Sequence, residues 1–319
     1  MVSSDYFAKL RSDFEEFYYQ KLWLKLTTME QDRLKYLHRF WILFFLMGVL
    51  LPALIIFIFG EWFYLILTQG SPKEIESLIK LCLLGATIII AVIGSPIVTY
   101  KLKIKDSIIE DFINYFGSFR YSPLSCIHDD IIRNSLLFNS YNRHSSDDHF
   151  YGTYKNVTMT ISEENLRYKH NKGESKIFKG IIILLDFPKS FQGQTVVFSD
   201  WGIFNFLHKI AIKLQHISFE DPVFEKKFEV FSNDQIEARF LLTTAFMERM
   251  LKVKKVFGGK KIQFSFFDNK LLIAISSAKD MFEPSSLFKS STDRRPINEV
   301  LEQFISVFAV IEFLKLTQQ

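Results

Sequence analysis

The side chains best suited to hold a metal ion lie close together in the middle of the chain: His144, Asp147, Asp148 and His149. Imidazole nitrogens and carboxylate oxygens are ligands for zinc and related ions. Metal sites usually draw their ligands from rigid elements, whereas these four residues lie on one polar stretch, 139–149, which is typical of a loop. We therefore predict no metal site and no cofactor, and name His144, Asp147 and His149 as the candidate ligands if a metal is bound.

A second chemical feature is a group of five lysines within ten residues: Lys252, Lys254, Lys255, Lys260 and Lys261. Beside an anionic leaflet, each lysine contributes on the order of 1 kcal/mol of attraction, which fades within a Debye length. The simpler interpretation is a solvated helix end, where lysines favour the negative pole of the helix dipole. The sequence leaves contact with the lipid surface open.

The sequence lacks the motifs of the common nucleotide-dependent and hydrolytic enzymes. It contains no Walker loop, no dinucleotide-binding glycine fingerprint, no nucleophile elbow and no HExxH motif. Its net charge of +4 is too small to indicate a nucleic-acid-binding protein. These absences favour a protein without catalytic activity.

Two uncharged hydrophobic stretches, residues 40–59 and 81–100, are each twenty residues long. A helix of this length can cross a hydrocarbon core of about 30 Å. Neither stretch carries the polar stripe of a helix that faces water on one side. We therefore predict a transmembrane hairpin over residues 40–100.

Positively charged residues flank this hairpin unequally. Nine lysines and arginines lie just before the first stretch and just after the second, and only Lys73 and Lys80 lie between them. Lys and Arg are retained on the cytoplasmic side of a membrane. Both termini are therefore expected in the cytoplasm.

Small and weakly polar residues recur every fourth position in the second hydrophobic stretch: Thr87, Ala91, Ser95 and Thr99. Such a strip lets two helix backbones approach closely in lipid. Packing against the first stretch within the same chain is the simpler interpretation, and homo-oligomerisation through the same strip is the alternative.

Helices are expected on both sides of the hairpin. In residues 1–39, Phe7, Leu10 and Phe14 follow the spacing of an amphipathic helix. Its nearly balanced charges favour docking on protein, and lying on the membrane face is the alternative. Residues 101–120 are expected to continue the second span as a stalk helix.

Residues 121–319 are expected to form a cytoplasmic domain. Alternating residues predict a strand over 151–161 and further strands after it, and Asp268 and Asn269 are predicted to form the turn of a hairpin.

Helical spacing appears twice in this domain. A helical block at 233–257 is interrupted near Thr243 and Thr244, and a C-terminal helix starts at Pro296. The expected fold is thus α+β, a two-helix transmembrane hairpin followed by an antiparallel-sheet domain with inserted and C-terminal helices. A barrel of the pleckstrin-homology type is the alternative for the sheet.

Several segments resemble a bacterial membrane family known as domain of unknown function 3137. They are YSPLS at 121–125, DDHFYGTYKNV at 147–157, IFKGIIILLDFPKSFQGQTVVFSD at 177–200, FEDPVFEKKFEVFSNDQIEARFLLTTAFMERM at 219–250 and FEPSSLF at 282–288. The chain departs from the family at Thr244, where members tend to have proline. The resemblance implies a multi-pass protein of the bacterial inner membrane with two spans, and it implies no activity and no catalytic residues.

These observations together predict a membrane-anchored cytoplasmic binding or scaffold module. Its expected partners are the lipid bilayer and an unidentified protein, with no nucleic acid, and a second copy of the chain is an alternative partner. A membrane-tethered enzyme or metal-dependent protein centred on residues 144–149 is the alternative function.

Overall fold

The structure is a computed structural model that describes residues 2–171, 173–187, 190–199, 214–257 and 261–316. The chain forms two compact units. The sheet unit comprises Met1–Phe17, Ile109–Glu283 and Asn298–Gln319, and the helical unit comprises Tyr18–Ile108 and Pro284–Ile297.

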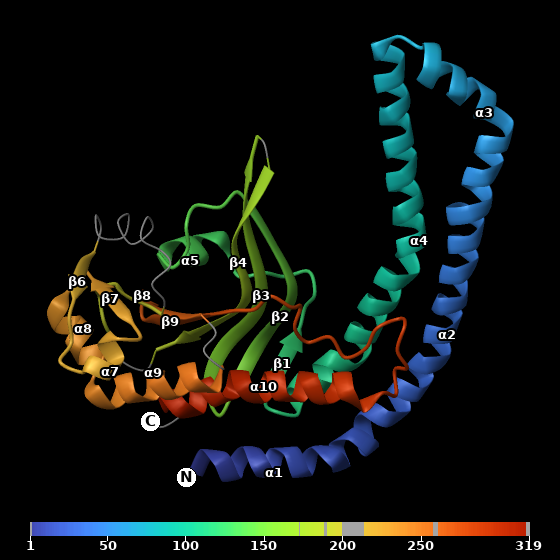
Figure 1. The fold of residues 1–319 in the computed structure, drawn as a ribbon. Helices are drawn as coiled ribbons and strands as arrows, with labels where there is room; N and C mark the ends of the chain where they lie inside the picture. The colour runs from blue at the N-terminus through green and yellow to red at the C-terminus, as the bar shows by residue number, and fades with distance from the viewer. Residues whose placement is uncertain (1, 172, 188–189, 200–213, 258–260, 317–319) are drawn as a thin grey trace. The chain divides into compact units, whose positions relative to one another are not determined.

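Two long helical runs make up most of the helical unit (Figure 1). The first run contains η1 (Tyr18–Leu22), α2 (Trp23–Phe45), η2 (Leu46–Leu50) and α3 (Leu51–Gln69), of which η1 and η2 are π-helical turns. The second run is α4 (Pro72–Asn114), which continues into the sheet unit.

The turn between α3 and α4 follows from local sequence. Gly70 has an extended backbone and ends α3. Ser71 and Glu74 then form a capping box at the start of α4, in which the Ser71 N–H donates to Glu74 Oε2 over 2.7 Å. Pro72 fits the first helical position because it lacks an N–H group.

Both runs expose apolar side chains over a membrane-length stretch. Each contains a segment long and apolar enough to cross a bilayer. Of the most apolar 18-residue segment, 0% is buried in the first run and 6% in the second. Phe57 and Ile90 are 87% and 69% exposed. The expected pair of apolar helices is thus confirmed.

A segment of residues 284–293 binds α2 within the helical unit. Glu30 Oε2 accepts hydrogen bonds from the backbone N–H and the hydroxyl of Ser291, each over 2.7 Å, and Arg33 donates to the carbonyl of Leu287 over 2.9 Å. The hydrogen bonds from Arg33 and Ser291 hold the pKa of Glu30 down at about 2. This carboxylate is therefore charged at neutral pH.

The sheet unit is built on nine antiparallel strands in the order β1-β2-β3-β4-β9-β8-β5-β7-β6. They are β1 (Ser118–Tyr121), β2 (Arg143–Tyr154), β3 (Val157–His170), β4 (Gly173–Asp186), β5 (Thr195–Phe198), β6 (Gln215–Ile217), β7 (Glu229–Ser232), β8 (Ile262–Phe267) and β9 (Lys270–Ser276). Within the described residues the sheet is open, with β1 and β6 at its edges. The α+β class is confirmed, with an open sheet where a barrel was the alternative.

Two hairpins turn on pairs of residues with left-handed backbone. Asp268 and Asn269 join β8 to β9, with φ of 51° and 57°, as expected. Lys155 and Asn156 join β2 to β3, with φ of 44° and 67°, inside the stretch predicted as one strand. That turn was not predicted because a turn of two residues does not interrupt the alternation of side chains along the sequence.

One face of the sheet is covered by α10 (Arg294–Leu314) (Figure 1). The ring of Phe304 lies 5.4 Å from that of Phe150, and the ring of Phe308 lies 4.5 Å from that of Tyr154. These contacts come from the side of α10 that its apolar spacing predicts.

The N-terminal helix α1 (Val2–Phe17) also packs in the sheet unit. Phe14 is buried and its ring lies 5.1 Å from that of Phe112. Arg11 forms an ion pair with Glu302 of α10 at 2.6 Å. The amphipathic helix therefore packs on protein.

The opposite face of the sheet carries α5 (Asp129–Asn134) (Figure 1). Ile132, Leu166 and Phe178 are buried together in this second core. The helical insertion consists of α8 (Gln235–Leu241) and α9 (Thr244–Val256), after a short α7 (Pro222–Glu225). Thr243 caps α9, so the block breaks where it was predicted to break.

Two local predictions were wrong. Stretch 139–149, predicted as a loop, contains the first half of β2, because one face of this strand carries a polar cluster and its alternation is not apolar. The stalk helix predicted to residue 120 ends with α4 at Asn114, and β1 begins at Ser118. Gly152 makes this edge possible, since a Cβ there would lie 2.1 Å from the carbonyl oxygen of Ser118.

Candidate functional site

A β-bulge in β2 places two aspartates opposite one glutamate. Ser146 pairs with Glu164 and His149 pairs with Ser162, so Asp147 and Asp148 together lie opposite Glu163. Bulges of this kind redirect side chains without breaking the hairpin.

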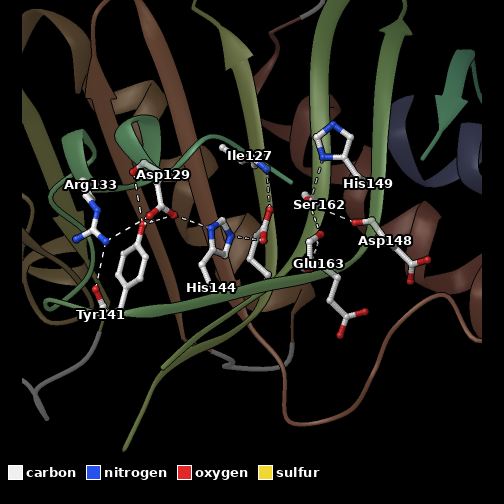
Figure 2. Close-up of polar contacts among 11 residues, drawn as sticks. Ile127, Asp129, Arg133, Tyr141, His144, Asp148, His149, Ser162 and Glu163 are labelled. Atoms are coloured by element: carbon white, nitrogen blue, oxygen red, sulfur yellow. Dashed lines mark hydrogen bonds and ion pairs between the residues drawn. The ribbon is translucent and has the colours of Figure 1, made fainter. Parts of the chain in front are cut away.

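The polar residues of this hairpin lie on two faces. Residues that pair across neighbouring strands share a face, and successive residues alternate. His149 and Ser162 therefore share one face, and Glu163 lies on the other. Figure 2 shows the carboxylates of Asp148 and Glu163 pointing away from His149.

The face that carries α5 holds the histidine cluster, which we define as Asp129, Arg133, Tyr141, His144 and Glu164. His144 is its centre: Nδ1 lies 2.6 Å from Asp129 Oδ1, and Nε2 lies 2.7 Å from Glu164 Oε2. The Tyr141 hydroxyl donates to Asp129 over 3.1 Å. The Arg133 guanidinium lies 4.2 Å from the centre of the Tyr141 ring (Figure 2).

His144 is held as a cation. Ionised carboxylate oxygens only accept hydrogen bonds, so both ring nitrogens must donate. The hydrogen bond to Glu164 raises the pKa of His144, against the effect of burial. The side chains of His144 and Glu164 are 12% and 0% exposed. This buried ion group ties α5 to the hairpin, and it leaves neither imidazole nitrogen available to activate a nucleophile.

The face that carries α10 holds the carboxylate cluster, which we define as Asp147, Asp148, Glu163 and Glu283. Oxygens of Asp147, Asp148 and Glu283 lie within 4.8 Å of one another. Ligand oxygens around an ion at about 2.4 Å are separated by at most twice that distance, so these three could hold a hard cation such as Ca²⁺. Tyr121 donates to Asp148 Oδ1 over 2.7 Å.

Glu163 is 3% exposed, and within the carboxylate cluster only Asp148, at 0%, is more deeply buried. Its Oε2 accepts a hydrogen bond from the Met281 N–H over 2.9 Å. Its Oε1 has no hydrogen-bond partner among the described residues. Burial, reinforced by the charges of Asp148 and Asp147, raises the pKa of Glu163 to about 8. Glu163 is therefore mostly protonated at neutral pH.

The structure separates the three metal candidates of the sequence. His144 belongs to the histidine cluster, Asp147 belongs to the carboxylate cluster, and His149 Nδ1 lies 3.4 Å from Ser162 Oγ. Burial lowers the pKa of His149. These three side chains therefore do not converge on one point.

The lysine group lies around the end of α9. Lys252 and Lys255 are exposed, while Lys254 donates to the carbonyl of Lys227 over 3.1 Å. Lys261 is half-buried immediately before β8, and Lys260 lies outside the described residues.

In α4, the hydroxyls of the small-residue strip bond to their own helix. Thr87 donates to the Leu84 carbonyl over 2.7 Å, and Thr99 to the Ser95 carbonyl over 2.8 Å. Thr87, Ala91 and Thr99 are exposed and Ser95 is half-buried.

The first helical run approaches α4 at Ile93, whose Cδ1 would be 3.4 Å from a Cβ on Gly48. Residues two positions apart in a helix are rotated by about 200° around its axis. Ala91, two positions before Ile93, therefore points away from this contact. Homo-oligomerisation through the strip stays a prediction.

Sequence reasoning missed Glu163, Glu164, Glu283 and Tyr141. A signal for two of them is visible: adjacent glutamates interrupt an apolar strand between Ile161 and Leu166, so one charge must lie on each face. Glu283 and Tyr141 reach the site from distant segments, and no local pattern marks them.

Residues 176–316 match the family described as "Protein of unknown function (DUF3137)", so the predicted resemblance is confirmed for that segment. The matched segment runs from β4 to α10 and includes neither the apolar helices nor β2 and β3. A search of curated proteins found no match.

Among solved structures, the mycobacterial trehalose monomycolate transport factor A is similar with a TM-score of 0.34 and 11% sequence identity, covering 63% of this chain and 92% of that chain. A similarity at this level carries no argument about function.

The histidine cluster yields a stability prediction. In His144→Gln, Glu164 loses its cationic partner while buried, so the free energy of unfolding should fall by about 3 kcal/mol at pH 6. The pKa of His144 is raised in the folded state. Its contribution is therefore complete below the unfolded value of about 6.5 and is lost as the pH rises through the folded value. Denaturation of the full chain in detergent at pH 6 and pH 9 measures both effects.

His149→Gln is the matched control, because His149 makes a 3.4 Å contact with Ser162 and no ion pair among the described residues. It should cost less than about 1 kcal/mol at either pH. Equal losses in the two variants would contradict the assignment of His144 as the centre of the cluster.

The carboxylate cluster yields a pH prediction that depends on a buried carboxyl group keeping its proton. The pKa of Glu163 is raised to about 8 in the folded state, so the native protein binds more protons than the unfolded chain above about pH 4.5. The free energy of unfolding should fall between about pH 4.5 and pH 8, by up to roughly 1.4 kcal/mol per unit. Glu163→Gln should remove this slope and be the more stable protein at pH 8.

Glu248→Gln makes the same chemical substitution at an exposed position of α9 and serves as control. Its stability profile should follow that of the unaltered chain. An unchanged slope in Glu163→Gln would show that other groups dominate the pH dependence.

Proposed function

We propose that this chain, which carries a DUF3137 segment over residues 176–316, is a membrane-anchored binding or scaffold module. The observation that carries the proposal is the exposed apolar surface of the two helical runs, of which 0% and 6% of the most apolar window is buried. A soluble protein buries such helices in its core.

The energetic argument is direct. Each large apolar side chain left in water costs about 1.5 to 3 kcal/mol relative to burial. Phe57, Ile56 and Ile90 are 87%, 66% and 69% exposed, and neighbouring residues on both runs are similar. A lipid bilayer removes this cost, and the helical backbone satisfies its own hydrogen bonds there.

The finer form of the proposal is a multi-pass protein of the bacterial inner membrane with both termini in the cytoplasm. The excess of Lys and Arg outside the hairpin supports this orientation. The domain of residues 121–319 is then a cytoplasmic module that binds a protein partner.

A scaffold role is favoured over catalysis by the histidine cluster. Both nitrogens of His144 are engaged by carboxylates, so the imidazole acts as a structural cation. A binding surface needs a rigid domain, and this buried ion group supplies rigidity.

The two natural cysteines test the anchor and its orientation. Cys126 lies before α5 and Cys82 lies in α4, and both are exposed free thiols. A membrane-impermeant maleimide should label Cys126 in inverted inner-membrane vesicles and not in intact spheroplasts. Cys82 should react only after detergent is added, because lipid covers it. Partial desolvation of the thiol, together with the nearby charges of Glu164 and Asp129, raises the pKa of Cys126, so labelling is carried out at alkaline pH.

Cys82→Ser and Cys126→Ser assign each signal to one thiol. Labelling of Cys126 in intact spheroplasts would place the termini outside the cytoplasm. Recovery of the chain in the soluble fraction after alkaline carbonate extraction would overturn the anchor itself.

The sheet unit is further proposed to touch the anionic membrane surface through Lys252 and Lys255, which are exposed near the end of α9. In nanodiscs with anionic lipid, amides around residues 252–255 should exchange with deuterium more slowly than in neutral nanodiscs. The difference should diminish at high salt, because screening shortens the range of the attraction.

Lys252→Gln with Lys255→Gln should abolish this protection. The control pair, Lys169→Gln with Lys176→Gln, removes the same charge from exposed positions near the β3–β4 turn and should leave it unchanged. Protection that is identical in both lipids would reduce the lysines to a solvated helix end.

A further inference from the structure

The end of the β3–β4 hairpin extends beyond the rest of the sheet (Figure 1). β3 after Arg167 and β4 before Gly180 pair only with each other in the sheet. The residues that the structure describes between Lys169 and Lys176 are all exposed. A macromolecule can therefore reach this part of the hairpin.

One face of the hairpin carries a row of cations. Arg143 of β2 pairs with Arg167 of β3, and Arg167 pairs in turn with Lys176 of β4. Directly opposite residues share a face and have Cβ atoms about 4.5 to 5.5 Å apart. Lys169, two positions after Arg167, lies on the same face. We define these four residues, all exposed, as the basic strip.

The fold balances only part of this charge. Arg167 forms an ion pair with Glu174 at 3.0 Å. The side chains of Arg143, Lys169 and Lys176 have no acidic partner among the described residues. Like charges directly opposite each other destabilise a sheet, so the row of Arg143, Arg167 and Lys176 works against folding. An anion bound across the row would relieve this repulsion.

The sequence adds to the same excess. Residues 165–176 contain four lysines and arginines and one acidic residue, Glu174, so their formal charge is +3. The basic strip therefore favours an anionic ligand over a neutral or cationic one.

The spacing of the strip indicates the shape of that ligand. Residues three or four apart on a helix have Cβ atoms about 5 to 6 Å apart, close to the step between the paired cations. Residues on one side of an extended strand are about 6.6 Å apart, which is a poorer match. Guanidinium groups bind carboxylates through two parallel hydrogen bonds. A helix with carboxylates along one face therefore fits the row.

We propose that the basic strip is the docking surface for an acidic helix of a protein partner, with glutamates or aspartates three or four residues apart along one face. This inference rests on the proposed scaffold function and names the chemistry of the partner.

The basic strip is separate from the lysines at the end of α9. Lys254 binds the carbonyl of Lys227, immediately before β7, and β7 is the fifth strand from β3 in the sheet order. At about 4.8 Å per strand, this is about 24 Å along the sheet. Such a distance exceeds the Debye length of about 8 Å at physiological salt. Substitutions in one group therefore serve as controls for the other.

Binding of labelled peptides to the full chain in nanodiscs of neutral lipid, measured by fluorescence anisotropy, tests the proposal. One alanine-rich peptide of about 20 residues, long enough to form a helix, carries its glutamates along one face. A second has the same composition, with its glutamates distributed around the helix. The first should bind roughly tenfold more tightly, and more weakly at high salt. Absence of binding, or equal binding of the two, overturns the proposal.

Inorganic tripolyphosphate presents the charged group of lipids and nucleic acids in soluble form. It should not displace the first peptide at equimolar concentration. Displacement at that concentration would assign the basic strip to phosphate and overturn its assignment to a protein partner.

Arg143→Gln with Lys176→Gln should weaken binding of the first peptide about tenfold. It should not lower the melting temperature, because it removes the two charges opposite Arg167. Lys252→Gln with Lys255→Gln is the matched control and should bind as the unaltered chain does. Unchanged affinity in the first variant, or an equal loss in both, would contradict the proposal.

This proposal and the membrane anchor fail separately. Maleimide labelling of Cys126 and alkaline carbonate extraction report on the anchor and do not depend on the basic strip. Failure of the peptide experiment would therefore leave the anchored module standing without this docking surface.

Discussion

The burial of two adjacent carboxyl groups is the constraint on which the middle of the sheet unit depends. Glu163 and Glu164 are 3% and 0% exposed, and β3 sends them to opposite faces of the sheet. A buried carboxyl group must either find a cation or hold its proton. Glu164 pairs with the cationic His144, and Glu163 holds its proton, with a pKa of about 8.

These two solutions organise the neighbouring elements. The cation opposite Glu164 also binds Asp129, so the histidine cluster connects the start of α5 to the β2–β3 hairpin. On the other face, the Met281 N–H binds Glu163, which fixes the segment that follows β9. The bulge at Asp147 and Asp148 adds acidic groups to that face and raises the proton affinity of Glu163. One hairpin thereby carries two electrostatic environments of opposite character.

The helical unit obeys a different constraint, because its surface is apolar where that of the sheet unit is mixed. Its two runs leave their most apolar windows almost wholly exposed. Its polar contacts gather instead where the segment around Ser291 binds Glu30 and Arg33. The same chain thus contains one surface suited to lipid and one domain suited to water.

Local physics explains what the sequence by itself determined. Hydrophobic length identified the two long apolar helices, turn chemistry identified the hairpin at Asp268 and Asn269, and the adjacent Thr243 and Thr244 marked the break in the helical block. Each signal is carried by residues that are neighbours in the chain. Only the tertiary structure decided the site: the bulge in β2 placed Asp148 with Asp147 opposite Glu163 and turned His149 to the face of His144, and Glu164, Tyr141 and Glu283 arrived from elsewhere in the sequence. A register shift of one residue moves a side chain to the other face of a sheet, and no composition or spacing records it.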